Sequence, residues 1–172
     1  KRFIVFELDN ISENRTLLPV VTIIIMETFL AKMRRLQGVR KVLLLEEAWK
    51  AIAKDGMASY VKYLYKTVRK YFGEAIVVTQ EVEDIISSPI VKESIINNAD
   101  CKILLDQRKY RNKFDQIQTL LGLTDKERAQ VLSINLSNDP ARRYKEVFIS
   151  LGGVQSAVYA TEVSDEEYLV RP

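Results

Sequence analysis

The sequence predicts an α/β fold, with a mostly parallel β-sheet, helices on both of its faces and a β-hairpin at the carboxyl end. Three observations support this fold. Short apolar runs lack the polar alternation of half-exposed strands, as expected for parallel strands that are buried on both sides. Segments with helical periodicity separate these runs. Near the end, two strand-like segments flank Gly152-Gly153, which is typical of a hairpin.

The composition limits the classes of function. A chain of 172 residues without linkers or repeats predicts a single domain, 1–172. It has no histidine, so imidazole cannot act as a base or metal ligand, and its one cysteine, Cys101, excludes an internal disulfide and fits a reducing compartment. A net charge of +3 is too small to indicate nucleic-acid binding by itself. The longest apolar run, 17–30, is interrupted by Pro19 and Glu27 and is too short to span a bilayer.

The first part of the chain is expected to alternate strands and helices. Residues 2–9 read as a strand, and Pro19 opens a segment that is long enough for a helix ending at Gly38, although its first half is rich in β-branched residues. A strand at 42–47 and a short helix at 48–54 follow. The face of the first helix that we expect to be buried consists of Val21, Ile25, Phe29, Met33 and Leu36.

The clearest amphipathic helix is 57–72. Its outer face carries Lys62, Lys66, Arg69 and Lys70, which form either a solvated helix face or a contact with DNA or a protein partner. The apolar residues recur at spacings of three and four: Met57, Val61, Leu64, Val68 and Phe72.

The remaining elements continue this alternation and then change in character. Strands are predicted at 75–80 and 101–106, with helical segments at 81–88 and 89–97 between them. A helix at 112–122 is followed by a second helix, which the capping box Thr124–Glu127 opens. The segments 145–151 and 154–163 form the predicted hairpin, and a second capping box, Ser164–Glu167, opens a last short helix.

Polar residues end several predicted strands. In open α/β sheets, ligands bind beyond the carboxyl ends of the parallel strands. Two adjacent carboxylates after a buried strand suit magnesium-nucleotide chemistry, because one can hold the hydrated ion while the next polarises the attacking water. A strand end that simply meets water is the alternative interpretation. The polar residues at the ends of the strands are Asp9, Glu46 with Glu47, Thr79 with Gln80, and Asp106.

Three segments in register carry a family resemblance. "KVLLLEEAWKAI" (41–52), "GEAIVVTQEVEDIISSPI" (73–90) and "IINNADCKILLDQ" (95–107) resemble the TraG-type conjugation ATPases, the VirB-class motors of type IV secretion systems. The resemblance implies a three-layer, RecA-like P-loop fold and the cofactors ATP and Mg²⁺.

The same resemblance implies roles for individual residues. Glu46 lies at the Walker B position and would hold Mg²⁺ through water, while Glu47 would be the catalytic base. Thr79 and Gln80 would contact the nucleotide, with Gln80 following the strand that reads the γ-phosphate. Walker B usually has aspartate where this chain has Glu46, whose extra methylene places the carboxylate about one bond further toward the metal.

The resemblance also implies what lies outside this sequence. None of the six glycines belongs to a G-x-x-x-x-G-K-[ST] loop, which the family has upstream of this region. We therefore expect a carboxyl-terminal portion of an ATPase domain that is inactive alone and belongs to a longer parent. The parent is expected to form a homo-oligomeric ring, taken as a hexamer, with other conjugation components and with DNA or protein as substrate. Its expected location is the cytoplasm, at the inner face of the bacterial membrane through its partners.

Two groups of basic residues are candidate contacts. Arg108, Lys109, Arg111 and Lys113 surround Tyr110 just after a predicted strand and would contact phosphate or a neighbouring subunit, or form a plain basic loop. Arg142 and Arg143 precede the hairpin. Since ring ATPases often lend an arginine across the subunit interface, this pair is a candidate for that role.

Two further functions stay open on the residues alone. Asp9, Glu46, Glu47 and Asp106 at neighbouring strand ends could bind two metal ions and form a metal-dependent nuclease. The chain could also be a non-catalytic interaction module.

Overall fold

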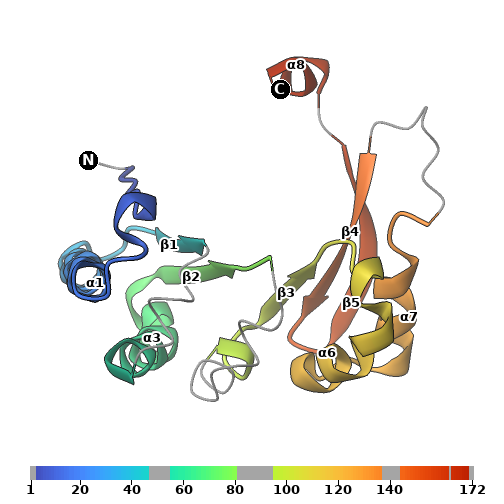
Figure 1. Cartoon of the computed structure of the whole chain (residues 1–172), viewed down its shortest axis with the longest axis horizontal. Coiled ribbons are helices and arrows are strands. Elements are labelled where there is room, and N and C mark those ends of the chain that lie inside the picture. Colours follow the sequence, from blue (N-terminus) through green and yellow to red (C-terminus); the bar gives the residue numbers. More distant parts are fainter. Residues whose placement is uncertain (1–2, 47–54, 81–94, 137–143, 163, 171–172) are drawn as a thin grey trace. The chain divides into compact units, whose positions relative to one another are not determined.

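The structure is a computed structural model that describes residues 3–46, 55–80, 95–136, 144–162 and 164–170 (Figure 1). The fold is of the α/β type, and the chain divides into two compact units, Lys1–Asn98 and Ala99–Pro172. That the two form one domain, as expected from the sequence, stays a prediction.

The first unit is built on two parallel strands. β1 (Lys41–Glu46) pairs with β2 (Gly73–Val78) from Lys41↔Gly73 to Glu46↔Val78. Two helices, α1 (Leu17–Arg35) and α3 (Asp55–Thr67), pack with one face of this pair. The core consists of Met26, Leu30, Met33, Val61, Leu64, Tyr65, Val68 and Ile95, against which Leu43, Leu45, Ala75 and Val77 of the strands pack.

The predicted first helix is confirmed, but its buried face is rotated from the predicted one. The amide oxygen of Asn14 accepts hydrogen bonds from the backbone N–H groups of Thr16 and Leu17, which satisfies donors at the helix start. Of the expected face, only Met33 is fully buried, because the contact with α3 and the sheet selects the neighbouring stripe. That stripe consists of Leu18, Thr22, Met26, Leu30 and Met33.

The strand predicted at 2–9 is not found. Residues 3–8 pair with no strand of the described part of the chain, and a 3₁₀ helix, η1 (Asp9–Ile11), follows them. Phe3 is 82% exposed. An apolar run forms a strand only where a neighbouring strand accepts its backbone hydrogen bonds, and the described residues offer none here.

The helix predicted at 57–72 is confirmed except at its end. Val61, Leu64 and Val68 are buried, as predicted. The helix continues into a 3₁₀ turn, η2 (Val68–Tyr71), and Phe72 then adopts a left-handed backbone with φ 54°. The prediction that Phe72 is buried is wrong, because this change of backbone geometry removes the ring from the helical stripe.

The second unit is an antiparallel sheet with helices. β3 (Cys101–Leu104), β4 (Tyr144–Leu151) and β5 (Gln155–Glu162) lie in the order β3-β4-β5. A 3₁₀ helix, η4 (Arg108–Lys113), leads into α6 (Phe114–Leu121), and α7 (Asp125–Ser133) and α8 (Asp165–Val170) follow. The hairpin of β4 and β5 confirms the prediction at the carboxyl end. The described residues of this unit that are completely buried are Phe114, Val131, Ile134 and Phe148.

The described strands do not form the mostly parallel sheet that the sequence predicts. They form one parallel pair and one three-stranded antiparallel sheet. β3 pairs with β4 from Cys101↔Leu151 to Leu104↔Phe148, because the hairpin offers it an antiparallel edge. The expectation that the strands are buried on both faces is also not met among the described residues, because alternate residues of β1 and β3 are exposed. An apolar run without polar alternation does not report the direction of the neighbouring strand either.

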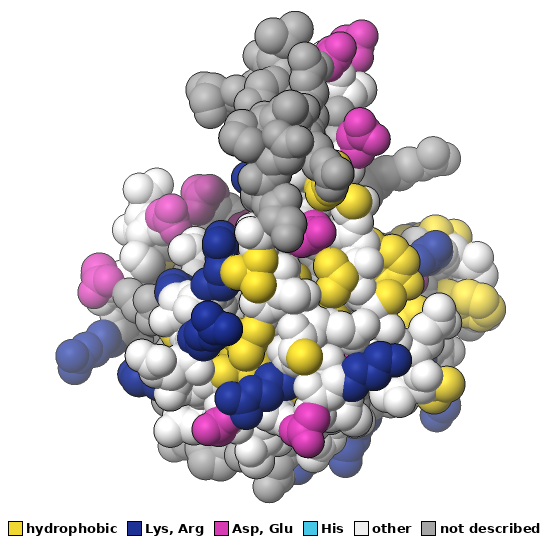
Figure 2. Space-filling view, turned by 90° about the vertical axis from the view of Figure 1, so that its right-hand side faces the viewer, with side chains coloured by type: hydrophobic (Ala, Val, Ile, Leu, Met, Phe, Trp, Pro, Cys, Tyr) yellow, Lys and Arg dark blue, Asp and Glu magenta, His cyan; other side chains and the backbone are white. Residues whose placement is uncertain are grey.

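Both predicted capping boxes are confirmed. Thr124 and Glu127 exchange side-chain and backbone hydrogen bonds at the start of α7, and Ser164 and Glu167 do so at α8. No helix in the described ranges is long and apolar enough to cross a membrane. The helices predicted at 48–54 and 81–97 lie wholly or largely outside the described residues. Figure 2 shows that hydrophobic side chains, among Lys and Arg, also remain on the surface.

Candidate functional site

The parallel register brings two of the predicted site segments to the same edge. Glu46 ends β1 and is the Cα partner of Val78, which ends β2. Thr79 and Gln80 follow Val78 directly, so they leave the sheet at the edge where β1 ends. The expected proximity of these strand ends follows from this pairing.

The side chains at this edge supply oxygen atoms that can act as metal ligands. Glu46 and Gln80 are exposed and Thr79 is half-buried. Along β1, Leu43 and Leu45 pack against the core while Val42, Leu44 and Glu46 occupy the exposed alternate positions. Carboxylate, hydroxyl and amide oxygens are suitable ligands for a hydrated Mg²⁺ ion, which prefers oxygen and retains several waters. These residues therefore fit the metal side of a nucleotide site.

The phosphate side of such a site is not supplied by this sequence. No glycine-rich G-x-x-x-x-G-K-[ST] loop occurs among the 172 residues, so no backbone cradle of that kind can hold the β- and γ-phosphates. Glu47, Arg142 and Arg143 lie outside the described residues, and their predicted roles stay predictions.

Some basic residues of the segment Arg108–Lys113 in the second unit form contacts within the chain. Arg108 donates to Asp106 through Nε, at 2.9 and 2.8 Å from the two carboxylate oxygens, and also through Nη2. These hydrogen bonds lower the pKa of Asp106. The ammonium of Lys109 lies 4.5 Å from the centre of the Tyr110 ring. Rather than a loop, the segment forms η4, whose exposed residues include Arg111 and Lys113.

The described residues do not support the nuclease arrangement. Asp9 begins η1 instead of ending a strand, and Asp106 is occupied by Arg108. Within the described ranges, no group of three or more Asp, Glu or Cys side chains is arranged to hold a metal ion.

Gln107 is a candidate site residue that the predicted strand ends alone do not indicate. Its side-chain oxygen is buried without a hydrogen-bond partner among the described residues. A signal for it exists, because "LLDQ" ends with glutamine after an apolar run, as "VVTQ" does at Gln80. A buried unsatisfied acceptor is costly, and it marks Gln107 as a candidate for a contact that the described residues do not make.

Asn135 and Glu127 are two further polar residues, and they form hydrogen bonds to distant parts of the sequence that the sequence alone does not indicate. Asn135 has a left-handed backbone, with φ 57°, and exchanges two hydrogen bonds with Glu146 at the start of β4. Glu127 extends beyond its capping box to accept a hydrogen bond from Ser150 of β4 at 3.2 Å. Burial raises the pKa of this carboxyl, but the hydrogen bonds from Thr124, Ser156 and Ser150 outweigh it, and the net shift is downward.

Comparison with known proteins agrees with this architecture. The solved structure of VirB4 from Thermoanaerobacter pseudethanolicus is similar, with a TM-score of 0.68 and 22% sequence identity. The alignment covers 96% of this chain and 43% of that one, so the chain spans less than half the length of its structural relative. No curated protein matches the sequence. The TraG P-loop domain family matches residues 1–171, nearly the whole sequence, and the chain belongs to this family.

Proposed function

We propose that the chain is part of the ATP-hydrolysing motor of a conjugative transfer, or type IV secretion, apparatus. The observation that carries the proposal is the β1–β2 register, which brings Glu46 and the Thr79-Gln80 segment to one edge in a member of the TraG P-loop domain family. In this proposal the chain supplies the Walker B and sensor residues. The longer parent supplies the phosphate-binding loop.

Each site residue has a distinct proposed role. Glu46 holds Mg²⁺ through water, and Glu47 accepts the proton of the attacking water. Gln80, with Thr79, contacts the γ-phosphate or that water, and Gln80 thereby reports the state of the nucleotide. ATP and Mg²⁺ are the proposed cofactors of the parent, and this chain alone is expected to hydrolyse ATP negligibly.

The proposed assembly is the one that the resemblance to conjugation ATPases implies. The parent would work as a homo-oligomeric ring, with a hexamer expected, beside other secretion components at the inner face of the cytoplasmic membrane. Arg142 or Arg143 would reach the neighbouring nucleotide, where an arginine stabilises charge in the transition state. Arg111 and Lys113 are exposed residues of η4, and they are proposed for contact with phosphate or a neighbouring subunit. ATP turnover would drive the transfer of DNA or protein.

The test is Mg²⁺-dependent ATP hydrolysis by the parent protein, compared with its Glu47→Gln variant. We expect turnover to disappear in the variant while ATP binding, measured by equilibrium titration, stays unchanged. Glu74→Gln is the matched control, because Glu74 lies near the amino end of β2, away from the proposed site. Turnover retained in Glu47→Gln would contradict the proposed role of Glu47, and cleavage of DNA by the chain with Mg²⁺ or Mn²⁺ would favour the nuclease instead.

A further inference from the structure

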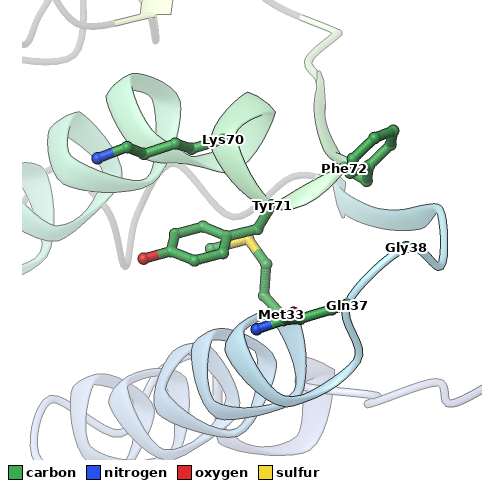
Figure 3. Close-up of a pocket in the computed structure, with 6 residues that line it drawn as sticks. All are labelled: Met33, Gln37, Gly38, Lys70, Tyr71 and Phe72. Atoms are coloured by element: carbon green, nitrogen blue, oxygen red, sulfur yellow. The ribbon is translucent and has the colours of Figure 1, made fainter.

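The amino end of the β1–β2 pair carries an exposed aromatic ring beside two hollows, opposite the edge with Glu46. Five residue steps of strand separate Lys41 from Glu46, about 16 Å. Phe72 lines both hollows. One, of about 300 Å³, is lined by Met33, Gln37, Gly38, Lys70, Tyr71 and Phe72 (Figure 3). The other, of about 420 Å³, is lined by Arg40, Arg69, Phe72, Gly73 and Glu74.

The ring of Phe72 is held outward by an unfavourable backbone. Its φ and ψ are 54° and 41°, a helix-ending conformation in which glycine or asparagine is the usual residue. The next residue must be small, because a Cβ on Gly73 would lie 2.6 Å from Cγ2 of Val68. Phe72 is 68% exposed, so packing among the described residues does not explain why a large aromatic residue occupies this position. An unexplained backbone outlier of this kind motivates a functional hypothesis.

Positive charge surrounds this ring. Arg40, Arg69 and Lys70 line the hollows. Among the described residues that line them, the acidic side chain is that of Glu74, which accepts a hydrogen bond from Nε of Arg40 at 2.8 Å. Figure 3 shows Phe72 and Lys70 pointing in opposite directions from the end of η2. A ligand that contacts both must therefore extend across the turn. We call Arg40, Arg69, Lys70 and Phe72 the Phe72 surface.

We propose that the Phe72 surface binds single-stranded nucleic acid, with a base stacked on Phe72 and the phosphates beside Arg69 and Lys70. An extended polymer with flat apolar groups and regularly spaced negative charges is complementary to this surface, which offers an aromatic ring and positive side chains. An acidic peptide would also satisfy the charge, but it would gain less from an exposed flat ring bordered by open hollows. Because stacking and phosphate contacts do not read base edges, the expected binding is independent of base sequence.

This inference extends the proposed function, in which DNA is one of the two candidate substrates, and it requires no ATP turnover. The binding measurement is made on the chain itself, without nucleotide or Mg²⁺. Failure of the ATPase test would therefore leave the binding result intact. Loss of nucleic-acid binding would likewise leave the roles of Glu46 and Glu47 unaffected.

The experiment is fluorescence anisotropy of a labelled oligothymidylate of about 20 nucleotides at a series of salt concentrations from about 50 mM. Phe72→Asn removes the ring and suits the left-handed backbone, so the variant should fold, which circular dichroism checks. We expect it to bind roughly 5- to 150-fold more weakly, and Phe72→Tyr to bind like the unmodified chain.

The charge contribution has its own matched pair of variants. Arg69→Gln with Lys70→Gln should reduce the slope of log affinity against log salt by about 1.4, because two phosphate contacts are lost. Lys126→Gln with Lys145→Gln removes the same charge from exposed positions of the other unit and should leave the slope unchanged. Absence of binding at low salt, or equal affinity in Phe72→Asn, would overturn the proposal. The proposal would also be overturned, in favour of an acidic protein segment, if polyglutamate displaced the labelled oligonucleotide at a lower concentration of negative charges than unlabelled oligothymidylate does.

Discussion

The buried carboxylate of Glu127 should stabilise the second unit in a manner that depends on pH. Its Oε2 accepts hydrogen bonds from the backbone N–H of Thr124 at 2.9 Å and from the hydroxyl of Thr124 at 3.0 Å. Its Oε1 accepts from Ser150, whose side chain is itself buried. The carboxylate thus joins the first turn of α7 to β4, and its removal affects two elements.

The expected cost follows from these contacts. Glu127→Ala leaves the Thr124 N–H and the buried Ser150 hydroxyl without this acceptor, and at about 1 kcal/mol or more for each it should lower the free energy of unfolding by about 2–3 kcal/mol. Glu127→Gln keeps the shape and one acceptor oxygen but loses the charge. It should cost about 1 kcal/mol at neutral pH, because hydrogen bonds to a charged group are the stronger ones.

The pH dependence has a defined sign. The pKa of Glu127 in the folded chain is lower than its ordinary value of 4.5, because its hydrogen bonds outweigh the opposing effect of burial. A lowered pKa contributes stability that is complete above the unfolded pKa and is lost as pH falls through the folded pKa. The stability difference between the unmodified chain and Glu127→Gln should therefore shrink below about pH 4.5.

Urea unfolding followed by circular dichroism, from neutral pH down to about pH 3, measures this difference. Glu167→Gln is the control, because Glu167 forms the same type of capping box with Ser164 but is exposed. It should change the free energy of unfolding by less than about 1 kcal/mol. A Glu127→Gln difference that stays constant from neutral pH to pH 3 would refute the reasoning, since the charge of the carboxylate would then contribute nothing.

Three further substitutions test other contacts by the same measurement. Gly73→Ala should destabilise by about 1–3 kcal/mol, because the new Cβ would lie 2.6 Å from Cγ2 of Val68 and 3.0 Å from its carbonyl oxygen; an unchanged midpoint would mean that η2 shifts freely. Tyr60→Phe removes the hydrogen bond from the Tyr60 hydroxyl to Glu27 and should lower the free energy of unfolding by about 1 kcal/mol. Burial and Glu27 raise the pKa of Tyr60 to about 12, so the hydroxyl stays protonated and this cost should not change between neutral pH and pH 9. Asn135→Ala should lower the free energy of unfolding by about 1–2 kcal/mol, and Asn135→Gly by less. Both variants lose the hydrogen bond from the Glu146 N–H, but alanine also disfavours the φ of 57°, which glycine adopts readily. Equal costs would refute the backbone contribution.

Local signals in the sequence predicted local structure well. The capping residues Thr124 and Ser164 and the Gly152-Gly153 turn are each a short pattern whose physical cause acts within a few residues. The presence of α1 was also predictable, despite its β-branched residues. Its buried face was not, because the contacts with α3 and the strands, which are distant in sequence, select Thr22 and Met26 over Val21 and Ile25.

Partner-dependent features could not be predicted from local pattern. Whether residues 3–8 form a strand depends on a neighbouring edge, and the direction of β3 depends on the hairpin beside it. For the candidate site, the strand ends at Glu46 and Gln80 were predictable from where apolar runs stop. The buried oxygen of Gln107 and the contact from Glu127 to Ser150 were not, because each depends on side chains brought together by the fold.

The exposed face of the β1–β2 pair connects the fold with the proposed activity. Val42, Leu44, Ile76 and Val78 are each between 39% and 55% exposed, and Glu46 occupies the next alternate position along the same face of β1. A parallel sheet normally has both faces covered, because its strands are apolar on both sides. A layer that covers this face in the parent would also exclude water around Glu46, and an electrostatic contact with Mg²⁺ is stronger where water is excluded. For the proposed ATPase, the phosphate-binding loop and a cover over this face are two separate requirements. Adding the loop sequence alone to the chain should therefore give less Mg²⁺-dependent ATP turnover than a longer protein that also covers the face, and equal turnover would contradict this requirement.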